Sequence, residues 1–394
     1  MSQLTFYLAP FSSDYAGACS ALFDLNAMVV IHDGHCCTSN YTSFDEPRWF
    51  GRHRPIYCSG LREIDAIMGN DRELLRKITM TLDGLEKRPD FIALLGSPVP
   101  SIIGTDFQGV SRELESEVGI PVIGLATTGL SYYDRGIDLA MQALARRFCD
   151  LTQPGEKGRV NVLGLTPLDF SDNENAADLL MYLCGEGWDA HSFMMGTNIE
   201  DIREASRAEV NLVASRAGIG LADWMEKSLG IPWVSGTVFG TENRSLSDRL
   251  QKAAEGGVSG GDNRSGITYK GSDGETGGLI IGDQIIANSI RERLEERYGI
   301  RNVAVGSFFG LDTRLSRPQD LYIRSEEELM KLLRSGKWGM AAADPLIFEI
   351  PGAERLQQVD LPHVAVSSRL YWHDYLRFGG KEGDAFLERC AGCL

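Results

Sequence analysis

Short apolar runs alternate with amphipathic stretches along most of the chain. The runs are continuous rather than alternating, as expected of strands covered on both faces. The predicted strands are 28–32, 91–96, 121–126, 160–165, 210–215, 279–281, 303–308 and 364–367. The predicted helices are 72–85, 134–148, 173–184, 218–228 and 284–296. In 134–148, for example, Ile137, Ala140, Met141 and Leu144 recur at the spacing of one helix face.

Strands alternating with helices predict an α/β chain with parallel sheets. Two polar segments divide the pattern: residues 154–158, and residues 255–278, of which nine of 24 are glycine. A segment so poor in large apolar residues cannot form a core. We therefore predict three doubly wound, Rossmann-like parallel-sheet domains, covering 1–153, 154–255 and 278–394. A glycine-rich linker or lid, 256–277, precedes the third.

The net charge and the lengths of the apolar runs exclude some classes of partner and location. The 394 residues carry 39 basic and 55 acidic side chains, a net charge of −16, which argues against nucleic acid or an anionic membrane as the main partner. No apolar run approaches the roughly 20 residues of a spanning helix, and the first ten residues lack the pattern of a signal peptide. We expect a soluble, cytoplasmic protein.

The densest group of reactive side chains follows the first predicted strand. Residues 32–37 read His-Asp-Gly-His-Cys-Cys, at the kind of strand end where open α/β sheets bind ligands. In a chain with no secretory features the thiols are expected to be reduced and free to bind metal. Adjacent cysteines point in different directions, so Cys36 and Cys37 could serve two irons of one cluster, or one could bind while the other packs.

The remaining cysteines are less distinctive. Cys58 ends a short extended stretch, and Cys19 lies in a small-residue helix where a core role and a cluster role are both open. Cys149 and Cys184 fall on amphipathic helices and are expected in the core. The Cys-x-x-Cys at 390–393 could be redox-active or metal-binding, but a frayed tail is the simpler interpretation.

Several catalytic motifs are missing from the sequence. It contains no G-x-x-x-x-G-K-[ST] phosphate loop, since neither glycine–lysine pair (336–337 and 380–381) is followed by a hydroxyl residue. Neither a G-x-S-x-G elbow nor an H-E-x-x-H helix occurs. Nucleotide hydrolysis by this chain and simple zinc proteolysis are therefore not expected.

Taken in order, several segments resemble the nitrogenase component 1 superfamily, which includes the nitrogenase catalytic and scaffold subunits and the nitrogenase-like reductases. Residues 15–18 and 29–37 are similar to the opening of that family, where a strand leads into a loop with a cluster cysteine. Further matching segments are 62–70, 102–106 with 119–122, 222–226 with 230–233, and 282–283. No single motif is decisive; their order along the chain carries the resemblance.

The resemblance implies a ligand set. Cys37 matches the central cysteine of the interfacial cluster in this family. The two other family cysteines would fall near Ser13 and near Ser97 or Pro98, and none of these positions is cysteine here. Cys58, Cys36 or Cys19 would have to compensate, or two identical subunits would pool Cys37 and one neighbour each. Residues 212–216, where catalytic subunits hold their cofactor cysteine, contain none.

The function implied is that of a nitrogenase-like reductase component. An iron–sulfur cluster (4Fe-4S or larger) would lie at the interface of a homodimer, or of a heterodimer with a paralogous subunit. A separate P-loop iron protein would deliver electrons, and a small or tetrapyrrole-like substrate would bind between the three domains. His363, His191 and Arg216 are candidate catalytic residues there, with purely structural roles as the alternative. A metallocluster assembly scaffold, or a metal- or chelate-binding protein, are the rival functions.

Overall fold

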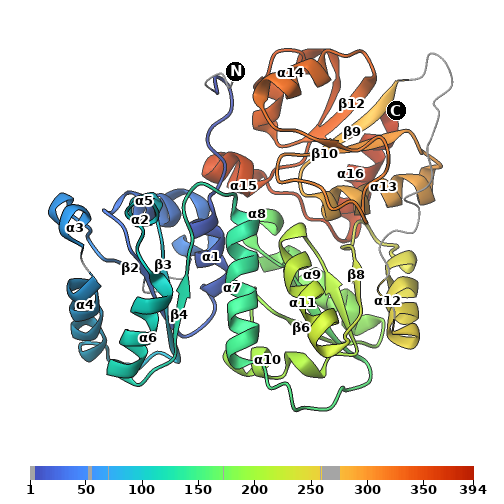
Figure 1. The fold of residues 1–394 in the computed structure, drawn as a ribbon. Coiled ribbons are helices and arrows are strands. Elements are labelled where there is room, and N and C mark those ends of the chain that lie inside the picture. The colour runs from blue at the N-terminus through green and yellow to red at the C-terminus, as the bar shows by residue number, and fades with distance from the viewer. Residues whose placement is uncertain (1–4, 52–55, 70, 172, 258, 260–275) are drawn as a thin grey trace.

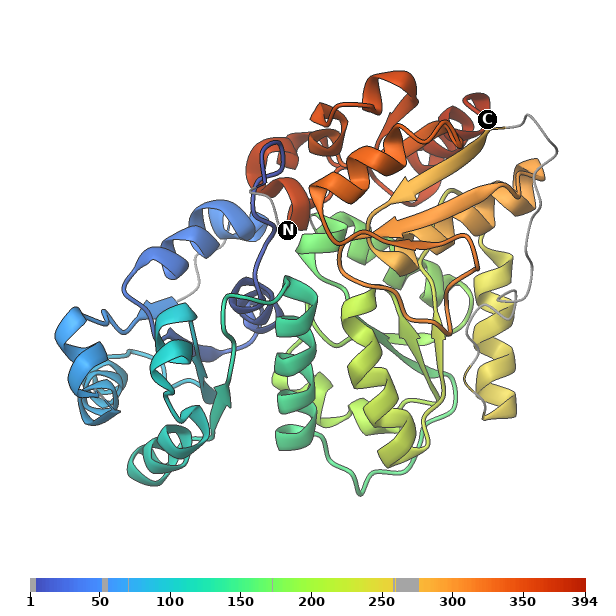
Figure 2. The ribbon, with the colours of Figure 1, turned by 45° about the horizontal axis from the view of Figure 1, so that its top comes forward.

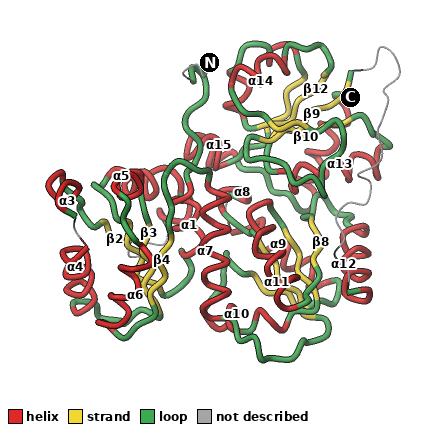
Figure 3. The backbone as a smooth tube through the Cα atoms, in the orientation of Figure 1, coloured by secondary structure: helices red, strands yellow, loops and turns green. Residues whose placement is uncertain are grey.

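The strands of the chain form three separate sheets, and every pair of neighbouring strands is parallel (Figures 1 and 3). The computed structural model describes residues 5–51, 56–69, 71–171, 173–257, 259 and 276–394. Helices pack around each sheet, and the central strands of all three are fully buried. The predicted fold class, three doubly wound parallel-sheet units, is confirmed.

The first sheet has the order β2-β1-β3-β4. Its strands are β1 (Ala27–Ile31), β2 (Ile56–Cys58), β3 (Phe91–Leu95) and β4 (Val122–Leu125). The helices of this part are α1 (Asp14–Leu22), α2 (Cys36–Asn40), α3 (Glu63–Met68), α4 (Asp71–Asp83), α5 (Pro98–Ile103), α6 (Phe107–Val118) and α7 (Tyr133–Phe148). A π-helical turn η1 (Tyr41–Asp45) and a 3₁₀ turn η2 (Pro47–Phe50) follow α2.

The second sheet repeats that order as β6-β5-β7-β8. Its strands are β5 (Arg159–Leu163), β6 (Asp189–Ser192), β7 (Val210–Val213) and β8 (Trp233–Ser235). Its helices are α8 (Pro167–Phe170), α9 (Asn173–Gly185), α10 (Ile199–Arg203), α11 (Ile219–Leu229) and α12 (Arg244–Gly256), with short turns η3 (Ala205–Arg207) and η4 (Arg216–Gly218).

The third sheet has the order β11-β10-β9-β12-β13, the 3-2-1-4-5 arrangement of a Rossmann sheet. Its strands are β9 (Gly277–Ile281), β10 (Val303–Ser307), β11 (Leu321–Tyr322), β12 (Trp338–Ala343) and β13 (Gln357–Asp360). Its helices are α13 (Gln284–Tyr298), α14 (Glu326–Leu333), α15 (Val364–Ser367) and α16 (Gly380–Gly392), with 3₁₀ turns η5 (Pro345–Glu349), η6 (Ala353–Arg355) and η7 (Ser368–Asp374).

One predicted strand is wrong. Residues 364–367 form the helix α15, and the edge of the sheet is taken instead by β13, a polar strand without an apolar run. The Asp344 carboxylate explains the turn, because its Oδ2 accepts hydrogen bonds from the backbone N–H of His363 (2.7 Å) and from the hydroxyl of Ser367 (2.7 Å). These two bonds tie both ends of a single helical turn to the end of β12.

The outlying cysteines also differ from expectation. Cys184 is exposed on α9 rather than in the core, and Cys149 is half-buried. The Cys-x-x-Cys pair belongs to the last turns of α16, where Cys390 is fully buried, so the chain does not fray there. Most of the predicted linker or lid, 256–277, lies outside the described residues. None of the described helices is both long and apolar enough to cross a lipid bilayer.

Helix α7 lies between the first and second sheets and contacts helices of both, α1 on one side and α11 on the other (Figures 1 and 2). Its crossing with α1 is unusually close. A Cβ atom at Gly136 would overlap the carbonyl oxygen of Asp14, and one at Gly17 would overlap the carbonyl oxygen of Tyr133. The crossing therefore requires glycine on both helices.

We expect Gly136→Ala to lower the free energy of unfolding by about 3 kcal/mol, because the backbone atoms it would strike cannot rotate away. Urea denaturation followed by circular dichroism measures the change. Gly185→Ala is the matched control: a Cβ there meets nothing within 4 Å, so helix propensity should stabilise the chain by about 0.5 kcal/mol. Equal midpoints for the two variants would contradict the steric argument.

Candidate functional site

The loops that follow β1, β2 and β3 are tied together at the carboxyl edge of the first sheet. The Ser59 hydroxyl lies 2.8 Å from Nδ1 of His32 and accepts the backbone N–H of Asp33 at 3.1 Å. The Ser97 hydroxyl donates to the carbonyl of His32 at 2.9 Å. Burial lowers the pKa of His32, which favours a neutral ring. The loop that carries the thiols is thus anchored from both neighbouring strands.

Three of the four predicted thiols lie on this edge. Cys36 is exposed and Cys37 half-buried at the start of α2, where the Asp33 carboxylate accepts the backbone N–H of Cys37 at 2.9 Å. Cys58 ends β2, opposite Ile31 of β1. Its Sγ donates to the carbonyl of Asp33 at 3.2 Å and accepts the N–H of Gly60 at 3.4 Å.

The environment of Cys37 disfavours a free thiolate. Burial, and then the negative charge of Asp33, raise the pKa of Cys37 to about 12. At neutral pH the metal-free thiol is therefore protonated, and metal binding would have to displace that proton. A cation at this position would remove the penalty that Asp33 imposes.

Cys19 is separated from this group. It is fully buried in α1, where burial and the nearby Glu46 and Asp45 raise its pKa well above the ordinary value. Among the described residues, no three His, Cys, Asp or Glu side chains come together closely enough to hold a metal ion. The thiols of one chain in this conformation do not make a complete metal site.

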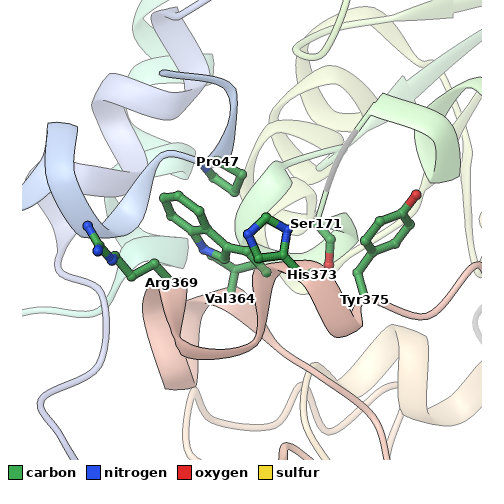
Figure 4. Close-up of a pocket in the computed structure, with 7 residues that line it drawn as sticks. Pro47, Ser171, Val364, Arg369, His373 and Tyr375 are labelled. Atoms are coloured by element: carbon green, nitrogen blue, oxygen red, sulfur yellow. The ribbon is translucent and has the colours of Figure 1, made fainter. Parts of the chain in front are cut away.

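A cavity of about 710 Å³ lies where the three parts of the chain meet (Figure 4). Figure 4 shows Pro47 from η2, Ser171 after α8, and Arg369, His373 and Tyr375 from η7 and its end around it. Val364 and Trp372 complete the lining. The wall is largely apolar and aromatic, with two basic side chains.

Residues with strained backbone conformations occur at both the thiol loop and the interdomain cavity. Within the described ranges, the non-glycine residues with positive φ are His35 (92°), Ser171 (63°) and Ser368 (49°). His35 precedes the cysteine pair, Ser171 lines the cavity, and Ser368 opens η7. Such conformations persist where the surrounding structure enforces them, and they concentrate at binding sites.

The predicted catalytic residues occupy three different environments. His363 is buried beside α8, with Nε2 2.9 Å from Oδ1 of Asp169; it precedes a helix, not the strand predicted there. His191 lies on β6, paired with Asp189 and Asp201. Arg216 forms an ion pair with Asp134 in a second cleft of about 480 Å³. None of the three lines the large cavity.

Sequence reasoning missed the carboxylates that accompany His363. Asp283 follows β9, Asp344 follows β12, and Asp169 lies shortly after β5. All three are buried. The signal that could have identified them is their position, because polar residues directly after buried parallel strands converge where sheets bind ligands.

The effect of Asp33 on Cys37 can be measured with a thiolate-selective reagent. Asp33→Asn removes the charge but keeps an oxygen that can accept the N–H of Cys37, so the pKa of Cys37 falls and its alkylation by iodoacetamide at pH 8.5 should accelerate about threefold to tenfold. Mass spectrometry of the Cys37 peptide follows the rate. Asp106→Asn, which alters the cap of α6 instead, should leave it unchanged.

Comparison with known proteins places this geometry in a family. Residues 13–255, which contain the thiol loop, match the model of the nitrogenase component 1 type oxidoreductases. The nitrogenase iron-molybdenum cofactor biosynthesis protein NifE of Clostridium pasteurianum is 28% identical over 198 residues, 50% of this chain and 42% of that protein. Subunit N of the light-independent protochlorophyllide reductase of Cyanophora paradoxa is 30% identical over 113 residues, 28% of this chain and 24% of that subunit.

The chain thus spans less than half the length of these curated relatives. Among solved structures, the one described as nitrogenase Cp1 at pH 6.5 superposes with a TM-score of 0.71 and 15% identity, covering 100% of this chain and 94% of that chain. The latter likeness concerns the fold. The predicted resemblance is confirmed: the chain belongs to the nitrogenase component 1 type oxidoreductase family.

Proposed function

We propose that this chain is a subunit of a nitrogenase-like reductase that binds an iron–sulfur cluster between two chains. In this proposal an ATP-dependent P-loop iron protein supplies the electrons, and the ligand to be reduced occupies the interdomain cavity. The observation that carries it is the placement of Cys36, Cys37 and Cys58 on one sheet edge within the segment that matches the family.

The thiol environment fits an iron–sulfur cluster. Thiolates are the ligands such clusters use, and the backbone N–H of Gly60 already points at Sγ of Cys58, as hydrogen bonds that tune cluster potentials do. When bound, the cluster would supply one-electron transfer. In this proposal Cys37 and Cys58 are the ligands of the cluster, and the exposed Cys36 is the alternative ligand from the same loop. Cys19 is too deeply buried to contribute.

A shared site explains the incomplete donor set of one chain. Two thiols from each of two chains would provide the four ligands of a 4Fe-4S cluster. Two relatives are named as subunits N and B of light-independent protochlorophyllide reductases, which supports an assembly with a paralogous subunit. A symmetric pair of identical chains is the second arrangement that the same thiols allow.

The cavity supports a substrate with an extended apolar body and negative charge. Its volume of about 710 Å³ admits ligands up to the size of a tetrapyrrole. Trp372 and Tyr375 offer aromatic faces, Arg369 offers a cationic group for carboxylates, and His373 offers an imidazole that can form hydrogen bonds. The Arg369 guanidinium stacks over the Phe44 ring, with its Cζ 5.5 Å from the ring centroid, which favours one orientation of that side chain.

A cluster-assembly scaffold is the second candidate. It is favoured by the relative that is named as a cofactor biosynthesis protein. In a scaffold the cavity would receive a metallocluster instead of an organic substrate and release it to another protein. The two functions differ in whether electrons from a donor end up in a product.

Ligand assignment is tested by iron analysis of protein purified without oxygen. We expect Cys37→Ala and Cys58→Ala each to lower iron and sulfide per chain at least fivefold and to abolish the electron paramagnetic resonance signal of the reduced cluster. Cys184→Ala, an exposed thiol on α9 of the second sheet, should retain the wild-type content. Iron content unaffected by both loop substitutions would rule out these ligands.

The reductase and scaffold functions separate in a donor assay. Mixing the cluster-loaded complex with a reduced iron protein and ATP should reduce the cluster, and the signal should decay again when an acceptor ligand is added. Omitting ATP is the control. A cluster that stays oxidised with donor and ATP, but moves intact to an apo-protein, would identify the scaffold instead.

A further inference from the structure

A buried acid–base group joins the second and third sheets. Oδ1 of Asp169 accepts a hydrogen bond from the Tyr133 hydroxyl and lies 2.9 Å from Nε2 of His363. The Asp169 side chain is completely buried, and its other oxygen, Oδ2, has no hydrogen-bond partner among the described residues. A buried carboxylate oxygen without a partner is costly unless a proton or a water molecule satisfies it.

Space for one water molecule lies beside Asp169. A small cavity of about 20 Å³ is lined by Asp169, His363 and Asp283 together with apolar residues of β9, α13 and the segment after β13. A volume of 10–15 Å³ is about the minimum for a water molecule. The two carboxyl groups and the imidazole thus line one small space.

The charges around the group are mostly negative. Asp134 on α7 and Asp344 after β12 approach from two sides, and the Asp283 carboxylate accepts the N–H groups of Ile285, Ile286 and Arg216. The Arg216 guanidinium forms an ion pair with Asp134 instead. Apart from His363 itself, few cationic side chains balance the negative charge of these carboxylates. Protons bound to the group can balance it instead.

The pKa shifts of His363 and Asp283 agree with proton binding by this group. Burial alone lowers the pKa of His363, but the hydrogen bond and charge of Asp169, with Asp344 and Asp283, raise it above the ordinary value. Burial and the charge of Asp169 raise the pKa of Asp283 to about 7. These shifts favour the charged form of the imidazole and a proton held on Asp283.

The group lies directly behind the wall of the interdomain cavity. Helix α8, which carries Asp169, packs on α15, which begins after His363 (Figure 1). Ser171, two residues after Asp169, and Val364, directly after His363, line the cavity itself. One layer of protein separates the acid–base group from a bound ligand.

We propose that Asp169, His363 and Asp283 form a buried proton-holding site that supplies protons to a ligand reduced in the interdomain cavity. The supply role rests on the proposed function, whereas the holding of protons does not. Asp169 acts as the positioning residue, because its Oδ1 fixes the imidazole and its charge keeps the ring protonated.

The chemistry balances with the proposed donor. Reduction of one double bond takes two electrons, delivered singly by the iron protein, and two protons, and it forms two new bonds to hydrogen. Each electron that reaches the ligand makes it more basic. Because His363 does not line the cavity, its Nε2 proton reaches the ligand by way of water or the hydroxyl of Ser171 at the cavity wall, where it forms the new bond to hydrogen. The ring becomes neutral, and a proton from Asp283 or from solvent restores the imidazolium before the next electron arrives.

Nuclear magnetic resonance of the metal-free chain with labelled histidine tests proton holding independently of the cluster. His363 should remain an imidazolium at pH 7. In Asp169→Asn the remaining effect of burial should make it neutral at that pH, while the ring signals of the half-exposed His191 stay unchanged. A neutral His363 in the wild-type chain at pH 7, or no response to the substitution, would overturn the proposal.

Should Asp169→Asn fail to fold, Asp283→Asn keeps the Asp169–His363 contact and an oxygen for the N–H groups of Ile285 and Ile286, while it removes the charge and the acceptor for the N–H of Arg216. It should lower the pKa of His363 and leave the melting temperature within a few degrees of wild type. An unchanged His363 titration in this folded variant would count against a shared proton site.

Turnover of the assembled complex tests the supply of protons. His363→Gln should slow product formation at least tenfold and flatten its pH profile, with iron content and the rate of cluster reduction unchanged. Cys184→Ala, at an exposed position on α9, is the control and should behave as wild type. Wild-type turnover by His363→Gln would overturn the supply role, whereas a wild-type complex without iron would instead refute the proposed function.

Discussion

The crossing of α1 and α7 is the contact on which the rest of the structure depends. Gly17 and Gly136 let the two backbones touch, and the Asp14 carboxylate at the start of α1 accepts the N–H groups of Thr128 and Gly129 from the loop before α7. From this contact α1 presents Tyr15 to Cys37, and α7 presents the Tyr133 hydroxyl to Asp169. One packing interaction therefore orients both the thiol loop and the buried acid–base group.

In all three sheets, residues with reactive side chains lie at or after the ends of buried strands, but the kind of side chain differs between the sheets. The first sheet offers thiols and the second and third offer carboxylates and an imidazole. The segment after the cysteines, formed by η1 and η2, links these regions. Its turn is held by the buried Arg48–Glu46 ion pair, and it brings Pro47 to the cavity wall. This segment therefore connects the thiol-bearing edge of the first sheet to the cavity.

Asp33 has two effects on the thiol loop. Its carboxylate accepts the backbone N–H groups of Cys37 and Thr38 at the start of α2, which stabilises that turn. The same negative charge raises the pKa of the Cys37 thiol. In the proposed function a bound cation would offset this charge.

The sequence by itself determined the three parallel sheets, because strands covered on both faces must be continuously apolar, and it located the thiols of the first strand end. It could not reveal β13, which is a polar edge strand, or α15, whose apolar residues adopt a helical turn because Asp344 holds it. Only the tertiary structure brought Asp169, Asp283 and His363 together across 194 positions of sequence separation, and removed Cys19 from the thiol group. Local periodicity reports which faces are buried, whereas contacts between sheets depend on how whole units pack.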